Sequence, residues 1–209
     1  MVETRVKICG ITRIEDGVAA AESGSWAVGF VLHAASPRLV SAAEAARIAK
    51  ALPPGVLRVG VFLHAPAGLV RTVEAEVELD LVQLHGDGAE ATCRAVGPER
   101  VILAARLARD GDVERALELP SAHVLVDHDR SLRVPASGTT DWNLAERLAR
   151  RRELTLLAGG LTSDTVEGAI RRVRPWGVDV SRGVESAPGI KDKGRILEFV
   201  ERVRRADAS

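Results

Sequence analysis

Arg5-Val6-Lys7-Ile8-Cys9-Gly10-Ile11-Thr12 is the stretch of sequence that most constrains the fold. It reads as a short apolar strand that ends on a cysteine and breaks at Gly10. Similar runs recur along the chain, and continuous apolar runs are typical of parallel strands buried on both faces. The sequence predicts strands at Val6–Cys9, Val28–Leu32, Leu57–Leu63, Leu81–Leu84, Val101–Ala104, His123–Asp127, Leu154–Leu157 and Gly177–Val180.

Helical patterns fill the gaps between these runs. Ala45, Ile48, Ala49 and Leu52 recur at the i, i+3, i+4, i+7 spacing of one helix face, and Pro53 then ends the pattern. Polar residues with short side chains precede two of the expected helices and are suited to cap them. These expected N-caps are Ser41, Thr162 and Ser163.

The alternation amounts to about eight strand–helix units. Divided among eight units, 209 residues leave about 26 each, the length of a compact (βα)8 TIM barrel. An open doubly wound sheet is the alternative, but no Gly-x-Gly-x-x-Gly follows the first strand, and a final helix after the last strand suits a closed barrel. We therefore expect an α/β fold, with residues 1–209 forming a single TIM-barrel domain around eight parallel strands.

The composition argues against several classes of function. Lys plus Arg and Asp plus Glu are each 29, so the net charge is zero, and no basic excess indicates nucleic acid or an anionic membrane as partner. No apolar run approaches the length of a membrane span, and the first residues lack a signal-peptide core. Cys9 and Cys93 lie in unlike contexts, which indicates free thiols in a reducing cytoplasm. The histidines show no metal-ligand spacing, so we expect no metal.

Two side chains at strand ends are candidates for acid–base catalysis, because this fold places its chemistry at the carboxyl ends of the strands. Cys9 ends the first strand, where nearby amides and cations would lower its pKa from about 8.5 toward neutral and produce a thiolate base. Asp127 ends an apolar strand, where partial desolvation favours the protonated form that a general acid requires. A packed cysteine and a loop-capping aspartate are the alternatives, and Asp129 competes with Asp127. Cys93 is interpreted as a packing residue.

Two glycine-containing turns after the last two strands indicate phosphate binding. Glycine lets backbone N–H groups approach an anion closely, and late barrel strands are a frequent place for such sites. Arg38 follows the second strand, where its guanidinium can make a two-pronged contact with a carboxylate, although a surface arginine is the alternative. The expected phosphate ligands are Gly159, Gly160, Ser181, Arg182 and Gly183, and the expected polar lining of the substrate site is Gln83 and His85.

Together these motifs resemble the phosphoribosylanthranilate isomerase family of tryptophan biosynthesis, over nearly the whole chain. Several motifs stand in the family's order, which is far more specific than any one of them alone. They are Val6–Thr12, Ser36–Arg38, Arg58–Phe62, Val82–Gly86, Val124–Asp127, Asp141-Trp142, Ala158–Leu161, Gly177–Ser181 and Gly183–Gly189.

The resemblance implies an Amadori rearrangement of N-(5'-phosphoribosyl)anthranilate to 1-(2-carboxyphenylamino)-1-deoxyribulose 5-phosphate. It implies that Asp127 protonates the ribose ring oxygen and that Cys9 removes the proton from the adjacent sugar carbon. Arg38 would hold the anthranilate carboxylate, and the glycine turns would hold the phosphate. The partner is then a small phosphosugar–anthranilate substrate, and no cofactor is expected because the substrate's iminium is the electron sink. The sequence leaves monomer and homodimer open.

Three departures from the family pattern leave two other functions open. Arg182 stands where the family usually has a second serine, Pro135–Gly138 replaces a glycine-rich loop, and Leu103 replaces a common lysine. The last two motivate a catalytically weak barrel that acts as a partner of another pathway protein. The other alternative is an isomerase that also accepts the related histidine-pathway aminoaldose, although barrels of that type have aspartate in the position of Cys9.

Overall fold

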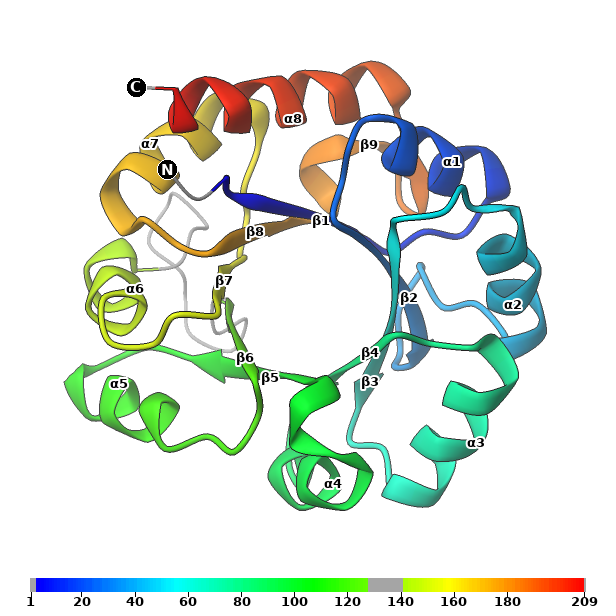
Figure 1. The fold of residues 1–209 in the computed structure, drawn as a ribbon, viewed down its shortest axis with the longest axis horizontal. Helices are drawn as coiled ribbons and strands as arrows, with labels where there is room; N and C mark the ends of the chain where they lie inside the picture. The colour runs from blue at the N-terminus through cyan, green and yellow to red at the C-terminus, as the bar shows by residue number, and fades with distance from the viewer. Residues whose placement is uncertain (1–2, 128–140, 209) are drawn as a thin grey trace.

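Eight parallel strands form a closed barrel in the computed structural model, which describes residues 3–127 and 141–208. The barrel closes because the first strand pairs with both the second and the eighth, and the helices surround it (Figure 1). The expected TIM barrel is thereby confirmed. The strands are β1 (Arg5–Cys9), β2 (Ala27–His33), β3 (Leu57–Leu63), β4 (Leu81–His85), β5 (Val101–Arg106), β6 (His123–Asp127), β7 (Thr155–Leu157) and β8 (Gly177–Val180).

A helix follows each strand and packs an apolar face against the barrel. Ser41 caps the second helix by accepting a hydrogen bond from the backbone N–H of Glu44, whose carboxylate accepts from the backbone N–H of Ser41. Thr162 is the N-cap of the seventh helix, whereas Ser163 is its first helical residue, one position from the prediction. The helices are α1 (Ile14–Glu22), α2 (Ala42–Ala51), α3 (Ala67–Val77), α4 (Ala89–Val96), α5 (Asp110–Leu117), α6 (Trp142–Ala149), α7 (Ser163–Val173) and α8 (Lys193–Asp207).

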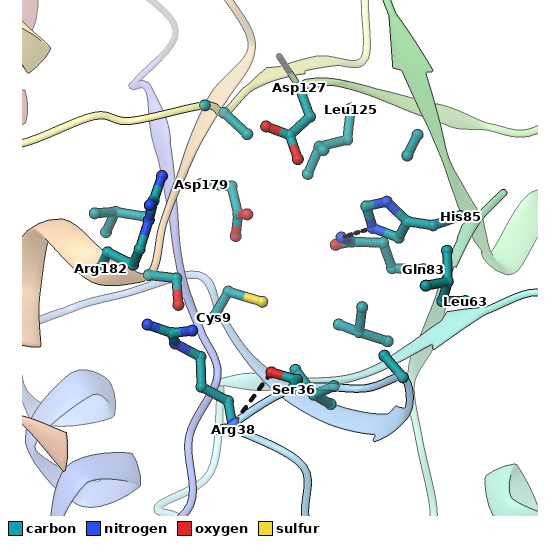
Figure 2. Close-up of a pocket in the computed structure, with 18 of the residues that line it drawn as sticks. Cys9, Ser36, Arg38, Leu63, Gln83, His85, Leu125, Asp127, Asp179 and Arg182 are labelled. Atoms are coloured by element: carbon teal, nitrogen blue, oxygen red, sulfur yellow. Dashed lines mark hydrogen bonds between the residues drawn. The ribbon is translucent and has the colours of Figure 1, made fainter. Parts of the chain in front are cut away.

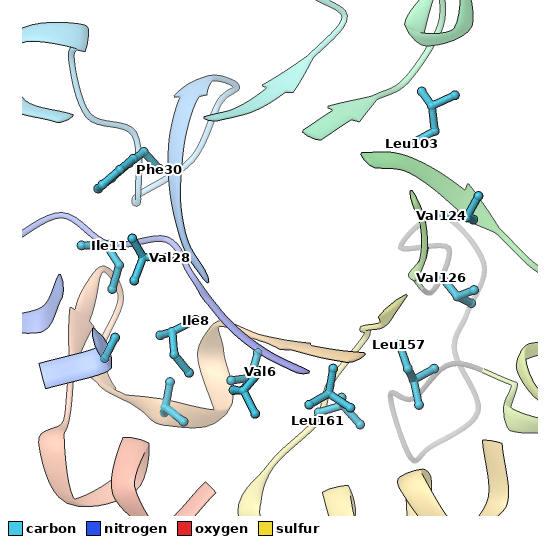
Figure 3. Packing of buried hydrophobic residues seen from close by; sticks show 14 of the residues in the cluster. Val6, Ile8, Ile11, Val28, Phe30, Leu103, Val124, Val126, Leu157 and Leu161 are labelled. Carbon is cyan, nitrogen blue, oxygen red and sulfur yellow. The ribbon is translucent and has the colours of Figure 1, made fainter. Parts of the chain in front are cut away.

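The core has an inner and an outer layer because successive strand side chains point to opposite faces of the barrel wall. The outer layer lies between the strands and the helices, and Figure 3 shows part of it around Ile8, Val28 and Phe30. Full burial of each such large side chain contributes roughly 1.5–3 kcal/mol. The inner layer packs inside the barrel and comprises Ala27, Val59, Leu81, Ile102, Leu125, Leu156 and Ala158.

Leu103 belongs to the outer layer, in the same cluster as Val124 and Val126 (Figure 3). Its neighbours Ile102 and Ala104 are the β5 residues that pack with the inner layer. The expectation that Leu103 weakens substrate electrostatics is therefore wrong, because this side chain points away from the interior. One of the two reasons for a catalytically weak barrel disappears with it.

An unpredicted antiparallel hairpin follows β8, consisting of β9 (Glu185–Ala187) and β10 (Ile190–Lys191) after the 3-10 turn η2 (Arg182–Val184). The Thr12 hydroxyl donates to the carbonyl of Gly189 at 2.5 Å, and the backbone N–H of Lys191 donates to the Asp16 carboxylate at 2.9 Å. These bonds fix the hairpin against the start of α1 and carry two buried charged side chains, Glu185 and Lys191, to the side of the barrel mouth.

Candidate active site

A cavity of about 350 Å³ opens at the carboxyl ends of the barrel strands, a volume that suits a small-molecule ligand. All the residues predicted to form the substrate site line it, although they come from six strands or the loops that follow them. Their chemical roles stay predictions at this point. The residues are Cys9, Arg38, Gln83, His85, Asp127, Gly159, Gly160, Ser181, Arg182 and Gly183.

Cys9 is the last residue of β1, and its sulfur points into the cavity (Figure 2). Only 8% of the residue is exposed. Burial raises the pKa of its thiol above the ordinary value, while the positive charges of Lys7 and Lys191 act in the opposite direction. The predicted direction was therefore wrong, because desolvation of the buried thiol outweighs the effect of the surrounding cations on its pKa. A thiolate base here depends strongly on those cations.

Asp127 ends β6 and points into the cavity from the side opposite Cys9 (Figure 2). The residue is half-buried, as its place at the end of an apolar strand predicts. The predicted long loop over His128–Thr140 lies outside the described residues, and so does the competing Asp129. The arrangement leaves space for a sugar between a thiol and a carboxyl group.

Arg38 lies beside Cys9, and its guanidinium is held by the Glu185 carboxylate. Nε donates to Oε1 at 2.7 Å and Nη2 donates to Oε2 at 2.5 Å. This pairing raises the pKa of Arg38 through the hydrogen bonds and the charge of Glu185, so the cation is secure. Because Nε and Nη2 already donate to Glu185, a substrate carboxylate can make the predicted two-pronged contact only with the Nη1–Nη2 edge of the guanidinium.

Gln83 and His85 are alternate residues of β4 and face the cavity together (Figure 2). Gln83 Nε2 and His85 Nε2 are 2.7 Å apart, and the amide nitrogen is the donor when that ring nitrogen is unprotonated. The Oε1 atom of Gln83 is buried and has no hydrogen-bond partner among the described residues. An unsatisfied buried acceptor at a cavity wall is suited to a hydroxyl group of a ligand.

The two glycine turns meet on one side of the cavity. Gly159 and Gly160 have φ of 89° and 80°, in the left-handed region that favours glycine. At Gly183 a Cβ would lie 2.1 Å from the carbonyl oxygen of Leu161, so only glycine permits the close approach of the two turns. Such turns present backbone N–H groups to an anion.

Two charged side chains are associated with the turn at Ser181–Gly183. Lys191 Nζ donates to the carbonyl and the hydroxyl oxygens of Ser181, at 3.1 and 3.3 Å, and so holds the last turn in place. Arg182 is exposed on the same turn and lines the cavity. Its position adds a positive charge at the end of the cavity where phosphate binding is predicted.

Sequence reasoning missed several polar residues of the site. Asp179, Arg106 and Ser36 line the cavity, and Lys7 is completely buried behind Cys9. A signal was available for two of them, because Lys7 and Cys9 alternate on β1, and a charged residue facing inward within an apolar strand is unusual. The same alternation places Asp179 on the inner face of β8.

A sequence model of the N-(5'-phosphoribosyl)anthranilate (PRA) isomerase family matches residues 6–202. The chain belongs to this family. The N-(5'-phosphoribosyl)anthranilate isomerase of Geotalea uraniireducens (strain Rf4) is 43% identical over 202 residues, which cover 96% of this chain and 98% of the relative.

Solved structures of PRA isomerases agree with the fold. The crystal structure of the enzyme from Thermotoga maritima has a TM-score of 0.89 and 40% identity, and the match covers 97% of this chain and 99% of that one. A PRA isomerase in complex with reduced 1-(o-carboxyphenylamino)-1-deoxyribulose 5-phosphate has a TM-score of 0.86 and 39% identity, with the same coverage.

Membership in the PRA isomerase family defines the activity as an Amadori rearrangement, an aldose–ketose isomerisation in tryptophan biosynthesis. Among residues 3–127 and 141–208, no helix has the length and apolar character to cross a bilayer. Within the same residues, no three His, Cys, Asp or Glu side chains are grouped to hold a metal ion.

Proposed function

We propose that Cys9 is the general base and Asp127 the general acid with which this chain converts N-(5'-phosphoribosyl)anthranilate into 1-(2-carboxyphenylamino)-1-deoxyribulose 5-phosphate. One observation carries the assignment: the thiol and the carboxyl group point into one cavity from opposite sides (Figure 2). The reaction requires an acid at the ribose ring oxygen and a base at a sugar carbon, so the two groups have to reach different parts of one sugar.

The rearrangement proceeds by two proton transfers. Asp127 donates a proton to the ring oxygen as its bond to the anomeric carbon breaks, and the lone pair of the anthranilate nitrogen forms an iminium. The Cys9 thiolate then takes the proton from the neighbouring carbon, whose C–H electrons form a C=C bond as the iminium electrons return to nitrogen. The resulting enolamine tautomerises to the ketone. Each transfer of this kind typically contributes a factor of about 10²–10⁴ in rate.

The remaining predicted residues anchor the two ends of the substrate. The turns at Gly159, Gly160 and Gly183 surround the phosphate, together with the Ser181 hydroxyl and the Arg182 guanidinium. Arg38 takes the anthranilate carboxylate at the other end, while Gln83 and His85 bind sugar hydroxyl groups. Anchoring both ends fixes the sugar between the acid and the base, which converts binding energy into orientation. No cofactor takes part, because the iminium formed by the substrate accepts the electrons.

The cellular setting is also part of the proposal. We place the enzyme in the cytoplasm, in keeping with two free cysteines. Residues 1–209 act as one domain, and the protein is a monomer or a homodimer in solution, which sedimentation equilibrium distinguishes.

Turnover of phosphoribosylanthranilate, followed by fluorescence, tests the two assigned roles. Cys9→Ala and Asp127→Asn are each expected to lower kcat by at least about 10²-fold, because each removes one proton transfer. Binding of the reduced product analogue should be largely kept. Cys93→Ala is the matched control, since Cys93 is fully buried in the outer core, away from the cavity. Wild-type kcat in Cys9→Ala or Asp127→Asn would overturn the assignment.

The same assay separates the two alternative functions. Turnover of the histidine-pathway aminoaldose by the wild-type protein would indicate a second substrate. A wild-type protein that turns over neither substrate but binds another pathway protein would indicate the catalytically weak barrel.

A further inference from the structure

Lys7 is a charged side chain in the barrel interior for which the proposed reaction has no direct use. Its side chain is 0% exposed, so it does not contact a ligand in the cavity. Nζ lies 2.7 Å from Oδ1 of Asp179. The two residues are Cα partners in the pairing of β1 with β8. The register of the barrel therefore places the carboxylate directly beside the buried ammonium.

Lys7 also lies against the proposed base. Lys7 and Cys9 are alternate residues of β1 and face the same side of the wall, and the ammonium interacts with the thiol by charge and by hydrogen bonding. Gly29, the Cα partner of Cys9 on β2, makes room for both groups. A Cβ at Gly29 would lie 2.9 Å from Cys9 Sγ and 3.1 Å from Lys7 Nζ.

The charges around the thiol come from four elements. Lys7 lies on β1, Asp179 on β8, Lys191 on β10 and Arg38 in the loop after β2. Glu185 pairs with both Lys191 and Arg38, which leaves Lys7 as the cation that bonds the sulfur.

Burial alone would favour the neutral form of the Lys7 amine, because a low-dielectric surrounding disfavours charge. Burial does act to lower the pKa of Lys7, but the charges and hydrogen bonds of Asp179 and Cys9 outweigh it, and the pKa ends above its ordinary value. Asp179 thus keeps the ammonium charged, and the charged ammonium opposes the effect of burial on the Cys9 thiol.

We propose that Lys7 is a positioning residue for the isomerisation: its ammonium, anchored by Asp179, stabilises Cys9 as a thiolate aimed into the cavity. This inference rests on the proposed function, in which Cys9 is the base. Lys7 acts through the sulfur and not on the substrate. The pair therefore offsets part of the desolvation that disfavours the thiolate, without exposing the sulfur to water.

Lys7→Met tests the inference, because methionine fills the space of the lysine stem without its charge. The pH dependence of Cys9 alkylation by iodoacetamide reports the thiol pKa, and the Cys9→Ala protein gives the background from Cys93. The thiol pKa is expected to rise by about one unit or more in Lys7→Met. The acidic limb of the kcat/KM profile should move up by the same amount, with kcat near neutral pH falling at least about tenfold and KM little changed. Lys193→Met, at an exposed lysine paired with Glu22, should change none of these values.

An unchanged thiol pKa in folded Lys7→Met would overturn the inference. Lys7→Gln decides the matter if Lys7→Met does not fold. Its amide N–H can still donate to Asp179, but the positive charge that lowers the pKa of Cys9 is gone, so the thiol pKa should rise. An unchanged thiol pKa in this variant also counts against the inference. Wild-type turnover by Cys9→Ala, in contrast, would reject the proposed function itself.

Discussion

Glu185 binds both Arg38 and Lys191, so one buried carboxylate connects the predicted carboxylate anchor with the predicted phosphate turn. Arg38 donates two hydrogen bonds to it, and Lys191 Nζ donates to Oε1 at 2.8 Å while also bonding Ser181. The backbone N–H of Gly189 adds a longer contact at 3.4 Å. In the proposed binding mode, the β9–β10 hairpin thereby supports the residues that hold both ends of the substrate.

Glu185→Gln should weaken substrate binding more than it slows the chemistry. The variant keeps an acceptor oxygen but loses the charge that fixes Arg38, so we expect KM to rise about tenfold, equivalent to about 1.4 kcal/mol, with kcat within about threefold of wild type. Steady-state kinetics measures both. Asp80→Asn is the matched control, because Asp80 holds Arg58 by a similar double hydrogen bond near the start of β3, away from the cavity. A lower kcat with unchanged KM in Glu185→Gln would contradict this account.

The same carboxylate makes stability depend on pH. Burial acts to raise the pKa of Glu185, but Arg38 and Lys191 outweigh it and the pKa ends below its ordinary value. The pair therefore contributes stability above the unfolded pKa of about 4.3, and this contribution is lost as the pH falls through the lower folded pKa. Urea unfolding at several pH values from neutral to acidic should show a shallower loss of stability in Glu185→Gln than in wild type. Equal slopes would show that the ion pair does not titrate in this range.

Most of the fold is encoded in local sequence patterns, which is why it could be predicted. Most strands of the barrel bury both faces and therefore carry a mainly apolar run, and the predicted and observed strand ranges differ by at most two residues at an end. The β9–β10 hairpin was missed because Glu185–Ala187 has no apolar run, and its hydrogen bonds depend on residues far away in sequence, such as Thr12 and Asp16. The hairpin therefore depends on tertiary contacts and not on a local sequence pattern.

The candidate site also has features that the sequence predicts and features that it does not. Residues at strand ends, such as Cys9 and Asp127, could be placed at the cavity because the fold dictates where strand ends gather. The pKa of the thiol could not be predicted from the sequence, because it depends on desolvation and on the charges of Lys7 and Lys191. Their distances to the sulfur arise only in the folded barrel. The prediction for Leu103 failed because it ignored side-chain direction. Side chains alternate along β5, so Leu103 points outward, and a comparison of motifs does not reveal this.

His123 is predicted to destabilise the barrel when it is protonated. Its ring lies 5.9 Å from that of Trp26 and 5.1 Å from that of Trp176, and its Nδ1 has no hydrogen-bond partner among the described residues. Burial, with a smaller effect of Arg152, lowers its pKa. Stability is then complete above the unfolded pKa of about 6.5 and is lost as the pH falls toward the lower folded value.

His123→Phe should remove that loss between neutral and mildly acidic pH while leaving kcat unchanged, since His123 begins β6 at the end of the barrel opposite the cavity. Urea unfolding at neutral pH and at pH 5 measures the effect. A wild-type pH slope in His123→Phe would mean that another group takes up the proton.

Gly183→Ala should weaken phosphate binding selectively. The new Cβ would lie 2.1 Å from the carbonyl oxygen of Leu161, a backbone atom that cannot rotate away, so the two glycine turns have to separate. We expect inhibition by inorganic phosphate to weaken about tenfold or more, as when about 1.4 kcal/mol of binding energy is lost, and KM for the substrate to rise in parallel. Gly68→Ala is the control, because nothing lies within 4 Å of its Cβ position in α3. Unchanged phosphate inhibition in Gly183→Ala would place the phosphate elsewhere in the cavity, since a separated pair of turns cannot present the same N–H groups to one anion.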